Sequence, residues 1–169
     1  MIIIALGANL ESPKYGLPLQ TCQAALLKLE EYGLKILNCS RWLKSAPVPI
    51  SDQPWYVNGV VEIETHLTPE DLLALLHRVE EEFGRVRTVP NAPRVIDIDL
   101  ITYHDIISDP DDHLILPHPR MHERAFVLLP LLDINETWYH PVIGKTAKEL
   151  SLNISCEQET MEFHSGAQG

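Results

Sequence analysis

The sequence has few cysteines and no long apolar run. Its three cysteines, Cys22, Cys39 and Cys156, are widely spaced, which excludes a disulfide framework and a zinc site built on paired cysteines. No apolar stretch approaches the roughly 18 residues of a membrane span. The apolar residues from Met1 to Leu6 have no basic flank and are too few for a signal sequence. We therefore expect a cytoplasmic protein that binds no membrane.

Several motifs of phosphate-binding and hydrolytic enzymes are absent as well. The chain has no Gly-x-x-x-x-Gly-Lys-Ser/Thr loop and no Gly-x-Gly-x-x-Gly fingerprint, which excludes a P-loop and a dinucleotide-binding turn. It also has no Gly-x-Ser-x-Gly, His-Glu-x-x-His or Cys-x-x-Cys. Phosphate chemistry in this chain then has to depend on a metal ion and arginines.

Positive charge is scarce and unevenly placed. The formal net charge of −11 argues against a nucleic-acid partner, because nucleic-acid surfaces are basic. No lysine occurs between Ser45 and Gly144, yet six of the seven arginines fall between residues 78 and 124. These six are Arg78, Arg85, Arg87, Arg94, Arg120 and Arg124. An acidic chain with an arginine-rich centre favours a small anionic ligand.

Two aspartates interrupt an apolar stretch from Val95 to Tyr103. Alternation along a strand places Asp97 and Asp99 on one face, with their backbones roughly 6 to 7 Å apart. Such a pair is often solvated at a strand end. Here it directly follows an arginine-rich loop, and carboxylates beside guanidinium groups are the two halves of a metal-nucleotide site. The combination favours Mg²⁺ and phosphates.

The remaining patterns predict an α+β fold. Strands are expected over residues 1–6, 34–43, 56–65 and 95–103, and helices over residues 16–32, 69–83 and 123–132. Thr68, Pro69 and Gly84 mark the ends of the second helix. This order is typical of ferredoxin-like folds with a mostly antiparallel sheet covered by helices in three αβα layers. We expect one domain over residues 1–150 and a loosely attached polar tail over residues 151–169.

Tyr56 and Asn58 stand two residues apart at the start of a predicted strand, and so on one face. A flat heterocycle needs a stacking surface and a group that both donates and accepts hydrogen bonds, which an aromatic ring and a carboxamide supply. By spacing alone, however, a tyrosine at the rim of the core and an asparagine at a strand edge are the commoner reading.

At this point the sequence resembles a known family. The segment Ala92-Pro-Arg-Val-Ile-Asp97-Ile-Asp99-Leu-Ile101 is similar to the signature of 6-hydroxymethyl-7,8-dihydropterin pyrophosphokinase. Four further matches occur in order along residues 1 to 150: Ala5 to Leu10, Asp52 to Asn58, Phe83 to Arg87, and Pro117 to Phe126.

The resemblance implies transfer of pyrophosphate from ATP to 6-hydroxymethyl-7,8-dihydropterin in folate biosynthesis, with AMP as the other product. It implies two Mg²⁺ ions on Asp97 and Asp99, with Arg85 and Arg94 as further catalytic residues. The implied ATP contacts are His77, Glu80, Arg85, Arg87, Arg94, Ile98, His118 and Arg124. The implied pterin contacts are Ser45, Pro47, Val48, Tyr56, Asn58 and Phe126. The chain is expected to act as a monomer.

Alternatives stay open at this level. Asp-x-Asp also occurs in other metal-dependent nucleotidyl or glycosyl transferases, and a non-catalytic ferredoxin-like domain that binds a small anion fits the same patterns. Without the resemblance, His77 and Glu80 are a solvated pair on one helix. The chain departs from the family in its arginine-rich loop, where Pro90 and Asn91 replace a basic residue and a tryptophan. We expect weaker closure of that loop over the ligands.

Overall fold

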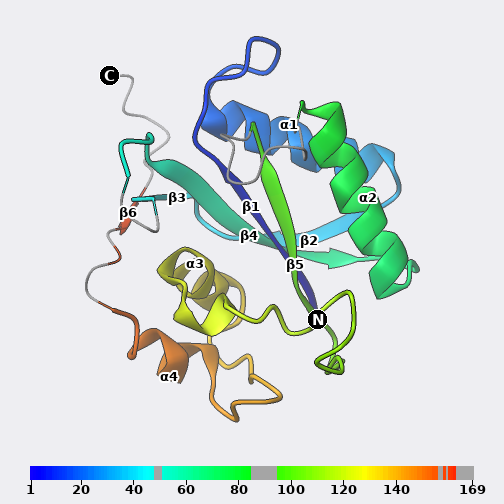
Figure 1. Ribbon diagram of the computed structural model, residues 1–169, viewed down its shortest axis with the longest axis vertical. Helices are drawn as coiled ribbons and strands as arrows, with labels where there is room; N and C mark the ends of the chain where they lie inside the picture. The colour runs from blue at the N-terminus through cyan, green and yellow to red at the C-terminus, as the bar shows by residue number, and fades with distance from the viewer. Residues whose placement is uncertain (48–50, 85–94, 156–157, 159, 163–169) are drawn as a thin grey trace.

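The computed structural model describes residues 1–47, 51–84, 95–155, 158 and 160–162. A sheet runs through the middle of the molecule, with α1 and α2 on one face and α3 and α4 on the other (Figure 1). The strands are β1 (Ile2–Ala8), β2 (Lys35–Cys39), β3 (Leu43–Ser45), β4 (Tyr56–Glu64), β5 (Asp97–Tyr103) and β6 (Thr160–Glu162). The helices are α1 (Pro18–Glu31), α2 (Pro69–Glu82), the 3-10 helix η1 (Met121–Glu123), α3 (Ala125–Asn135) and α4 (Ala147–Ser151).

The sheet has the order β5-β1-β4-β3-β6, and β2 pairs with the other end of β4. Every pairing between these strands is antiparallel. Since β1 lies between β4 and β5, the arrangement is the predicted ferredoxin-like α+β fold with three layers. Within the described residues, no helix is both long and apolar enough to cross a membrane.

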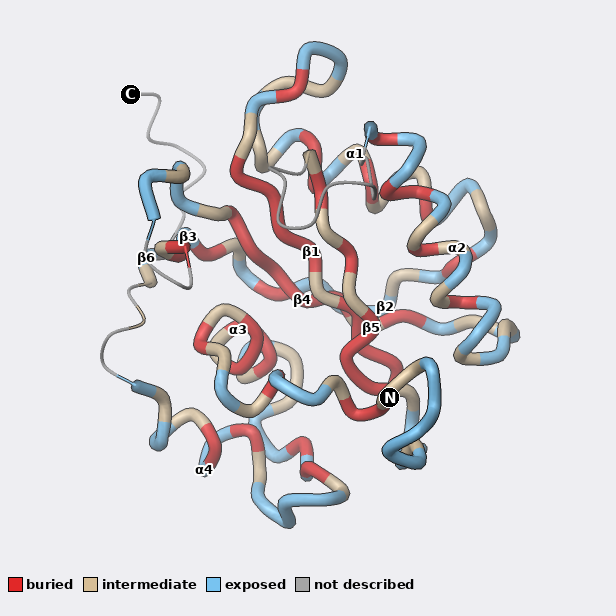
Figure 2. The backbone as a smooth tube through the Cα atoms, viewed as in Figure 1, coloured by how far each residue is buried: buried red, intermediate tan, exposed pale blue. Residues whose placement is uncertain are grey.

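Each face of the sheet has its own apolar core. Ile4, Leu6, Ile98 and Leu100 pack with the buried stripes of α1 and α2. Ile3, Val60 and Ile101 pack on the other face with η1, α3 and α4. Figure 2 shows the buried strands running between the two helical layers. Strands that are buried on both faces are typically continuous apolar runs, as β1 is.

The structure confirms the local predictions around α2 and β5. Thr68 caps α2, because its hydroxyl accepts a hydrogen bond from the backbone N–H of Asp71 at 3.2 Å. The helix ends before Gly84, whose φ of +97° is in the left-handed region that favours glycine. Ile96, just before β5, and Ile98 within it are buried in the core, whereas Asp97 and Asp99 are half-buried on the opposite face.

The predicted single strand over residues 34–43 is instead two strands, β2 and β3. The break occurs at Ser40, whose side-chain oxygen accepts a hydrogen bond from the backbone N–H of Val60 at 2.9 Å. The Ser40 side chain thus accepts the hydrogen bond that, in a continuous strand, a backbone carbonyl would accept. Only the second piece, β3, reaches the part of β4 that carries Tyr56 and Asn58.

Part of the polar segment after residue 150 joins the sheet, whereas the sequence predicted a loosely attached tail. Its strand β6 pairs with β3, with Thr160 opposite Ser45. The Gln158 side chain accepts a hydrogen bond from the backbone N–H of Ala125 at 2.8 Å and donates one to the carbonyl of Glu123 at 2.5 Å. Helix α4 was also not predicted. The division of the chain at residue 150 stays a prediction.

His140, in the segment between α3 and α4, is held in a neutral form. Its side chain is 4% exposed, and its Nδ1 accepts hydrogen bonds from the backbone N–H groups of Val142 and Ile143 at 3.2 and 3.1 Å. The His122 ring lies 5.9 Å away, centroid to centroid. Burial, and then His122, lower the pKa of His140 below its ordinary value of 6.5.

We therefore expect acid to destabilise this region. The unfolded chain binds a proton at His140 more readily than the folded chain, so the free energy of unfolding decreases as the pH falls through 6.5. His140→Asn keeps an acceptor near the position of Nδ1 but cannot titrate. Urea unfolding at pH 7 and pH 5 should show a smaller pH dependence in this variant than in the wild type. An unchanged difference between the two pH values contradicts the expectation.

Candidate active site

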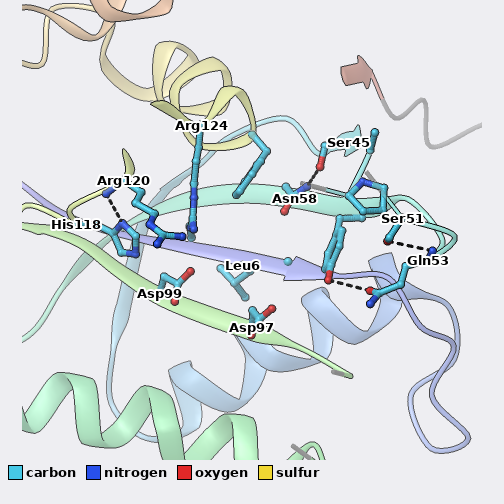
Figure 3. A pocket seen from close by; sticks show the side chains of 16 residues that line it. Leu6, Ser45, Ser51, Gln53, Asn58, Asp97, Asp99, His118, Arg120 and Arg124 are labelled. Atoms are coloured by element: carbon cyan, nitrogen blue, oxygen red, sulfur yellow. Dashed lines mark hydrogen bonds between the residues drawn. The ribbon is translucent and has the colours of Figure 1, made fainter. Parts of the chain in front are cut away.

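A cavity of about 610 Å³ opens where β1, β4 and β5 meet the segment that leads into α3 (Figure 3). Nine of the residues predicted to form the site line it: Ser45, Pro47, Tyr56, Asn58, Asp97, Asp99, His118, Arg124 and Phe126. The remaining lining residues are Ala5, Leu6, Gly7, Ala46, Ser51, Gln53 and Arg120. The structure therefore brings together predicted site residues that are up to 81 positions apart in the sequence, from Ser45 to Phe126.

The register of the sheet aligns the two ends of this cavity. Gly7 on β1 is opposite Asn58 on β4 and also opposite Asp97 on β5. Asn58 and Asp97 therefore lie in one row across three strands, about 10 Å apart at the backbone, which is two strand spacings. Two residues away along β1, on the same face of the sheet, Ala5 is opposite Asp99. The small residues of β1 thus form the floor between the carboxamide and the carboxylates.

Gly7 has no room for a side chain. A Cβ atom at this position would lie 2.7 Å from Oδ1 of Asn58, which is closer than real Cβ contacts allow. Asn58 is itself fixed, because its Nδ2 donates a hydrogen bond to the buried hydroxyl of Ser45. Glycine in β1 therefore gives the Asn58 carboxamide its space.

Asp97 and Asp99 point into the cavity below Arg124 (Figure 3). Burial lowers the pKa of Arg124 and the two carboxylates partly offset this, Asp99 more than Asp97. The guanidinium carbon of Arg124 also lies 5.4 Å from the centre of the Phe126 ring. Arg124 consequently stands between the acidic pair and an aromatic wall of the cavity.

His118 is neutral in this environment. Its backbone N–H donates to the carbonyl of Ile101 at 2.8 Å, and its Nδ1 accepts a hydrogen bond from the backbone N–H of Arg120 at 3.2 Å. Burial, followed by the charges of Arg124 and Arg120, lowers the pKa of His118 to about 4. With Nδ1 occupied as an acceptor, the proton is on Nε2, which makes that atom a donor.

The opposite end of the cavity is built around amide groups. The Nδ2 of the buried Asn9 donates to Oε1 of Gln53 at 3.2 Å and to the carbonyl of Pro54 at 3.1 Å. The hydroxyl of Tyr56 donates to the same Gln53 oxygen at 3.5 Å. Asn9, directly after β1, thereby positions the segment before β4. The Gln53 side chain in that segment presents its amide to the cavity (Figure 3).

Three predicted ATP contacts lie outside this cavity. His77 lines a second cavity of about 650 Å³ between α2 and residues 106–116. Glu80 is not a solvated residue, because it is 1% exposed and its Oε2 accepts a hydrogen bond from the backbone N–H of Ile98 at 3.3 Å. The side chain of Ile98 is buried in the apolar core. Glu80 and Ile98 thus connect α2 with β5.

The predicted contacts Arg85, Arg87, Arg94 and Val48 lie outside the described residues, as do Pro90 and Asn91. Their roles stay predictions. Seven residues that line the first cavity were not predicted as ligand contacts, and two of them, Arg120 and Gln53, have long polar side chains. Arg120 follows His118 by two residues and Gln53 precedes Tyr56 by three, so both lie inside segments already singled out for their neighbours.

The sequence matches the family model of 7,8-dihydro-6-hydroxymethylpterin-pyrophosphokinase (HPPK) over residues 3–136. It is 41% identical over 143 residues to the folic acid synthesis protein fol1 of Pneumocystis carinii, which covers 85% of this chain and 18% of that protein. It is 36% identical over 155 residues to the 2-amino-4-hydroxy-6-hydroxymethyldihydropteridine pyrophosphokinase of Synechocystis sp., which covers 91% of this chain and 76% of that protein.

The fold is similar to that of Plasmodium falciparum HPPK-DHPS in a crystal structure, with a TM-score of 0.68, 15% sequence identity, and coverage of 89% of this chain and 44% of that chain. The chain thus spans less than a fifth of the fol1 protein but three quarters of the Synechocystis protein. Because the family match extends over most of the sequence, the chain belongs to the 7,8-dihydro-6-hydroxymethylpterin-pyrophosphokinase family of diphosphotransferases.

Proposed function

We propose that this protein transfers a diphosphoryl group from ATP to the hydroxymethyl group of 6-hydroxymethyl-7,8-dihydropterin, as a step of folate biosynthesis. The pterin hydroxyl oxygen forms a bond to the β-phosphorus of ATP. The bond between that phosphorus and the oxygen bridging to the α-phosphorus breaks, and AMP leaves with the electron pair. The hydroxyl proton passes to solvent, so the products are AMP and the pterin diphosphate.

The observation that carries the proposal is the row formed by Asn58, Gly7 and Asp97 within one cavity. A heterocycle bound at Asn58 extends across Gly7 towards the acidic pair, which brings an attached hydroxyl group to the end where phosphates are held. A reaction between two bound substrates gains most from such positioning.

Mg²⁺ fits the acidic pair. Two half-buried carboxylates offer hard oxygen ligands, and Mg²⁺ binds to proteins through one or two carboxylates together with substrate phosphates and water. Within the described residues, no group of three or more His, Cys, Asp or Glu side chains is placed to hold a metal ion. Asp97 and Asp99 would hold two Mg²⁺ ions, which neutralise charge on the phosphate oxygens and on the leaving group when bound.

The other end of the cavity supports recognition of the pterin. Asn58 has a donor and an acceptor for the amide-like edge of the heterocycle, and its contact with Ser45 fixes which atom faces the ligand. Tyr56 and Phe126 offer aromatic surfaces for the flat rings. Gln53 adds an amide that is already oriented by Asn9 and Tyr56. Groups fixed in advance cost little ordering entropy when the substrate binds.

His118 and Arg124 support binding of the triphosphate. Arg124 is a permanent cation next to the acidic pair, and the Nε2–H of His118 donates to a phosphate oxygen without requiring a charged ring. The cavity beside His77 includes the apolar side chains of Leu73, Ile106 and Ile107, which offer a packing surface for the adenine ring of ATP. Arg85, Arg87 and Arg94 are proposed to complete the phosphate contacts.

A product analysis tests the function. The purified chain is incubated with ATP, Mg²⁺ and 6-hydroxymethyl-7,8-dihydropterin, and nucleotides are separated by ion-exchange chromatography. AMP should form in equal amount to the pterin diphosphate, only when the pterin is present, and not after chelation of the metal. Formation of ADP, or of AMP without pterin, contradicts the proposal.

A further inference from the structure

Three basic side chains from one short segment line the same side of the cavity. His118 precedes η1, Arg120 is its N-terminal flanking residue, and Arg124 follows it. Figure 3 shows the side chain of Arg120 beside His118 and directed towards Arg124, above Asp99. The hydrogen bond from the backbone N–H of Arg120 to Nδ1 of His118 keeps the two residues in a fixed relation.

The positive charges of Arg120 and Arg124 repel each other, and both oppose protonation of the neutral His118 ring. The charge of Arg120 disfavours the protonated forms of both His118 and Arg124. Across the described part of the chain, the Arg120 guanidinium forms no ion pair with a carboxylate, whereas Arg41 and Arg78 each contact an acidic side chain. Arg124 has carboxylates nearby, chiefly that of Asp99, whereas the guanidinium group of Arg120 is left available to an anion.

An exposed arginine is often only a solvated surface group. Arg120 is exposed as a residue, yet it lines the cavity together with the acidic pair and lies next to two basic groups that point to the same space. Placing the guanidinium groups of Arg120 and Arg124 farther apart would avoid the repulsion between them. Their concentration at one wall of a cavity indicates a ligand with several negative charges.

We propose that Arg120 is a further binding residue for the phosphate chain of the nucleotide, where its guanidinium group forms a clamp with that of Arg124 and with the Nε2–H donor of His118. This inference rests on the proposed function and extends it to a residue that was not among the predicted ligand contacts. The planar guanidinium of Arg120 donates two parallel hydrogen bonds to phosphate oxygens, which an ammonium group cannot do.

The test compares Arg120→Gln and Arg120→Lys with the wild type. Calorimetry measures the Kd of three ligands: the α,β-methylene analogue of ATP, inorganic tripolyphosphate, and the pterin. Arg120→Gln should weaken binding of both phosphate ligands by about tenfold or more, as expected for a lost charge-assisted contact. Arg120→Lys should recover part of that loss, and the pterin Kd should stay within about twofold of the wild type.

Lys35→Gln is the matched control. It removes one positive charge from an exposed pair with Glu64, at the end of β4 far from Asn58, so any loss that is due to net charge alone appears here as well. Wild-type phosphate affinity in Arg120→Gln overturns the inference, and so does an equal loss in Lys35→Gln. Equal weakening of phosphate and pterin binding overturns it too, because that result indicates a structural role.

The two proposals can fail separately. If the wild type forms AMP but Arg120→Gln binds both phosphate ligands normally, the function stands and the clamp is wrong. If the wild type forms no AMP but binds tripolyphosphate with a dependence on Arg120, the clamp stands and the function is wrong. If the wild type binds neither phosphate ligand, both are wrong.

Discussion

Replacing Asp97 or Asp99 with asparagine is expected to lower kcat by at least about 10³-fold, equivalent to about 4 kcal/mol of transition-state stabilisation. The reason is that a neutral amide holds Mg²⁺ far more weakly than a carboxylate does. The free energy of unfolding without metal should stay close to that of the wild type, because relief of the repulsion between the two carboxylates on one face of β5 offsets the lost attraction to Arg124. AMP formation at saturating Mg²⁺ and urea unfolding without metal give the two values.

Asp111→Asn is the appropriate control, since Asp111 is exposed and lines neither cavity. It should leave both the rate and the unfolding free energy within experimental error of the wild type. A structural role for the acidic pair would give the reverse pattern. Asp97→Asn would then lose several kcal/mol of stability while each folded molecule kept its activity.

The second large effect is expected at Asn58. Asn58→Ala should raise the Kd of the pterin by about fivefold to a hundredfold, corresponding to about 1 to 3 kcal/mol for a buried polar contact that is lost. The affinity for the ATP analogue should not change, because the phosphate wall is on the far side of Gly7. Fluorescence titration with each ligand separates the two effects.

Two further variants sharpen this test. Ser45→Ala removes the hydroxyl that orients the Asn58 carboxamide and should weaken pterin binding by less than Asn58→Ala does. Asn38→Ala changes an exposed asparagine on β2 that contacts Glu62, and should have no effect on either ligand. An equal loss of pterin and nucleotide affinity in Asn58→Ala contradicts a role in reading the heterocycle.

Local signals made α2 and β5 predictable. The cap at Thr68 and the glycine at position 84 act within one turn of the helix, and the alternation that separates Asp97 and Asp99 from Ile98 is a property of any strand. The same holds for Tyr56 and Asn58, which share a face because they are two residues apart. Predictions of this kind need no knowledge of distant contacts.

The features that were missed depend on distant contacts. The strand over residues 34–43 divides because the Ser40 hydroxyl meets Val60, and β6 forms because β3 leaves an edge for it. The residue pattern alone, without the family resemblance, predicts a solvated Glu80, but the approach of β5 covers it and supplies the backbone N–H of Ile98 as a hydrogen-bond donor. Tertiary contacts determined the divided strand, the pairing of β6 and the burial of Glu80. The periodicity of apolar residues along the chain carries no information about such contacts.

The pairing register of β1 has a consequence for substrate choice. Asn58 and Asp97 are separated by two strand spacings, roughly 10 Å. This spacing sets the distance that a substrate must span between the edge recognised by Asn58 and its reacting hydroxyl. A single-ring pyrimidine with a hydroxymethyl group is too short to span it. We expect such a compound to compete with the pterin without becoming diphosphorylated, which mass spectrometry of the products can check. Side-chain substitutions cannot reset this length, since it is fixed by the hydrogen-bonded backbone of three adjacent strands.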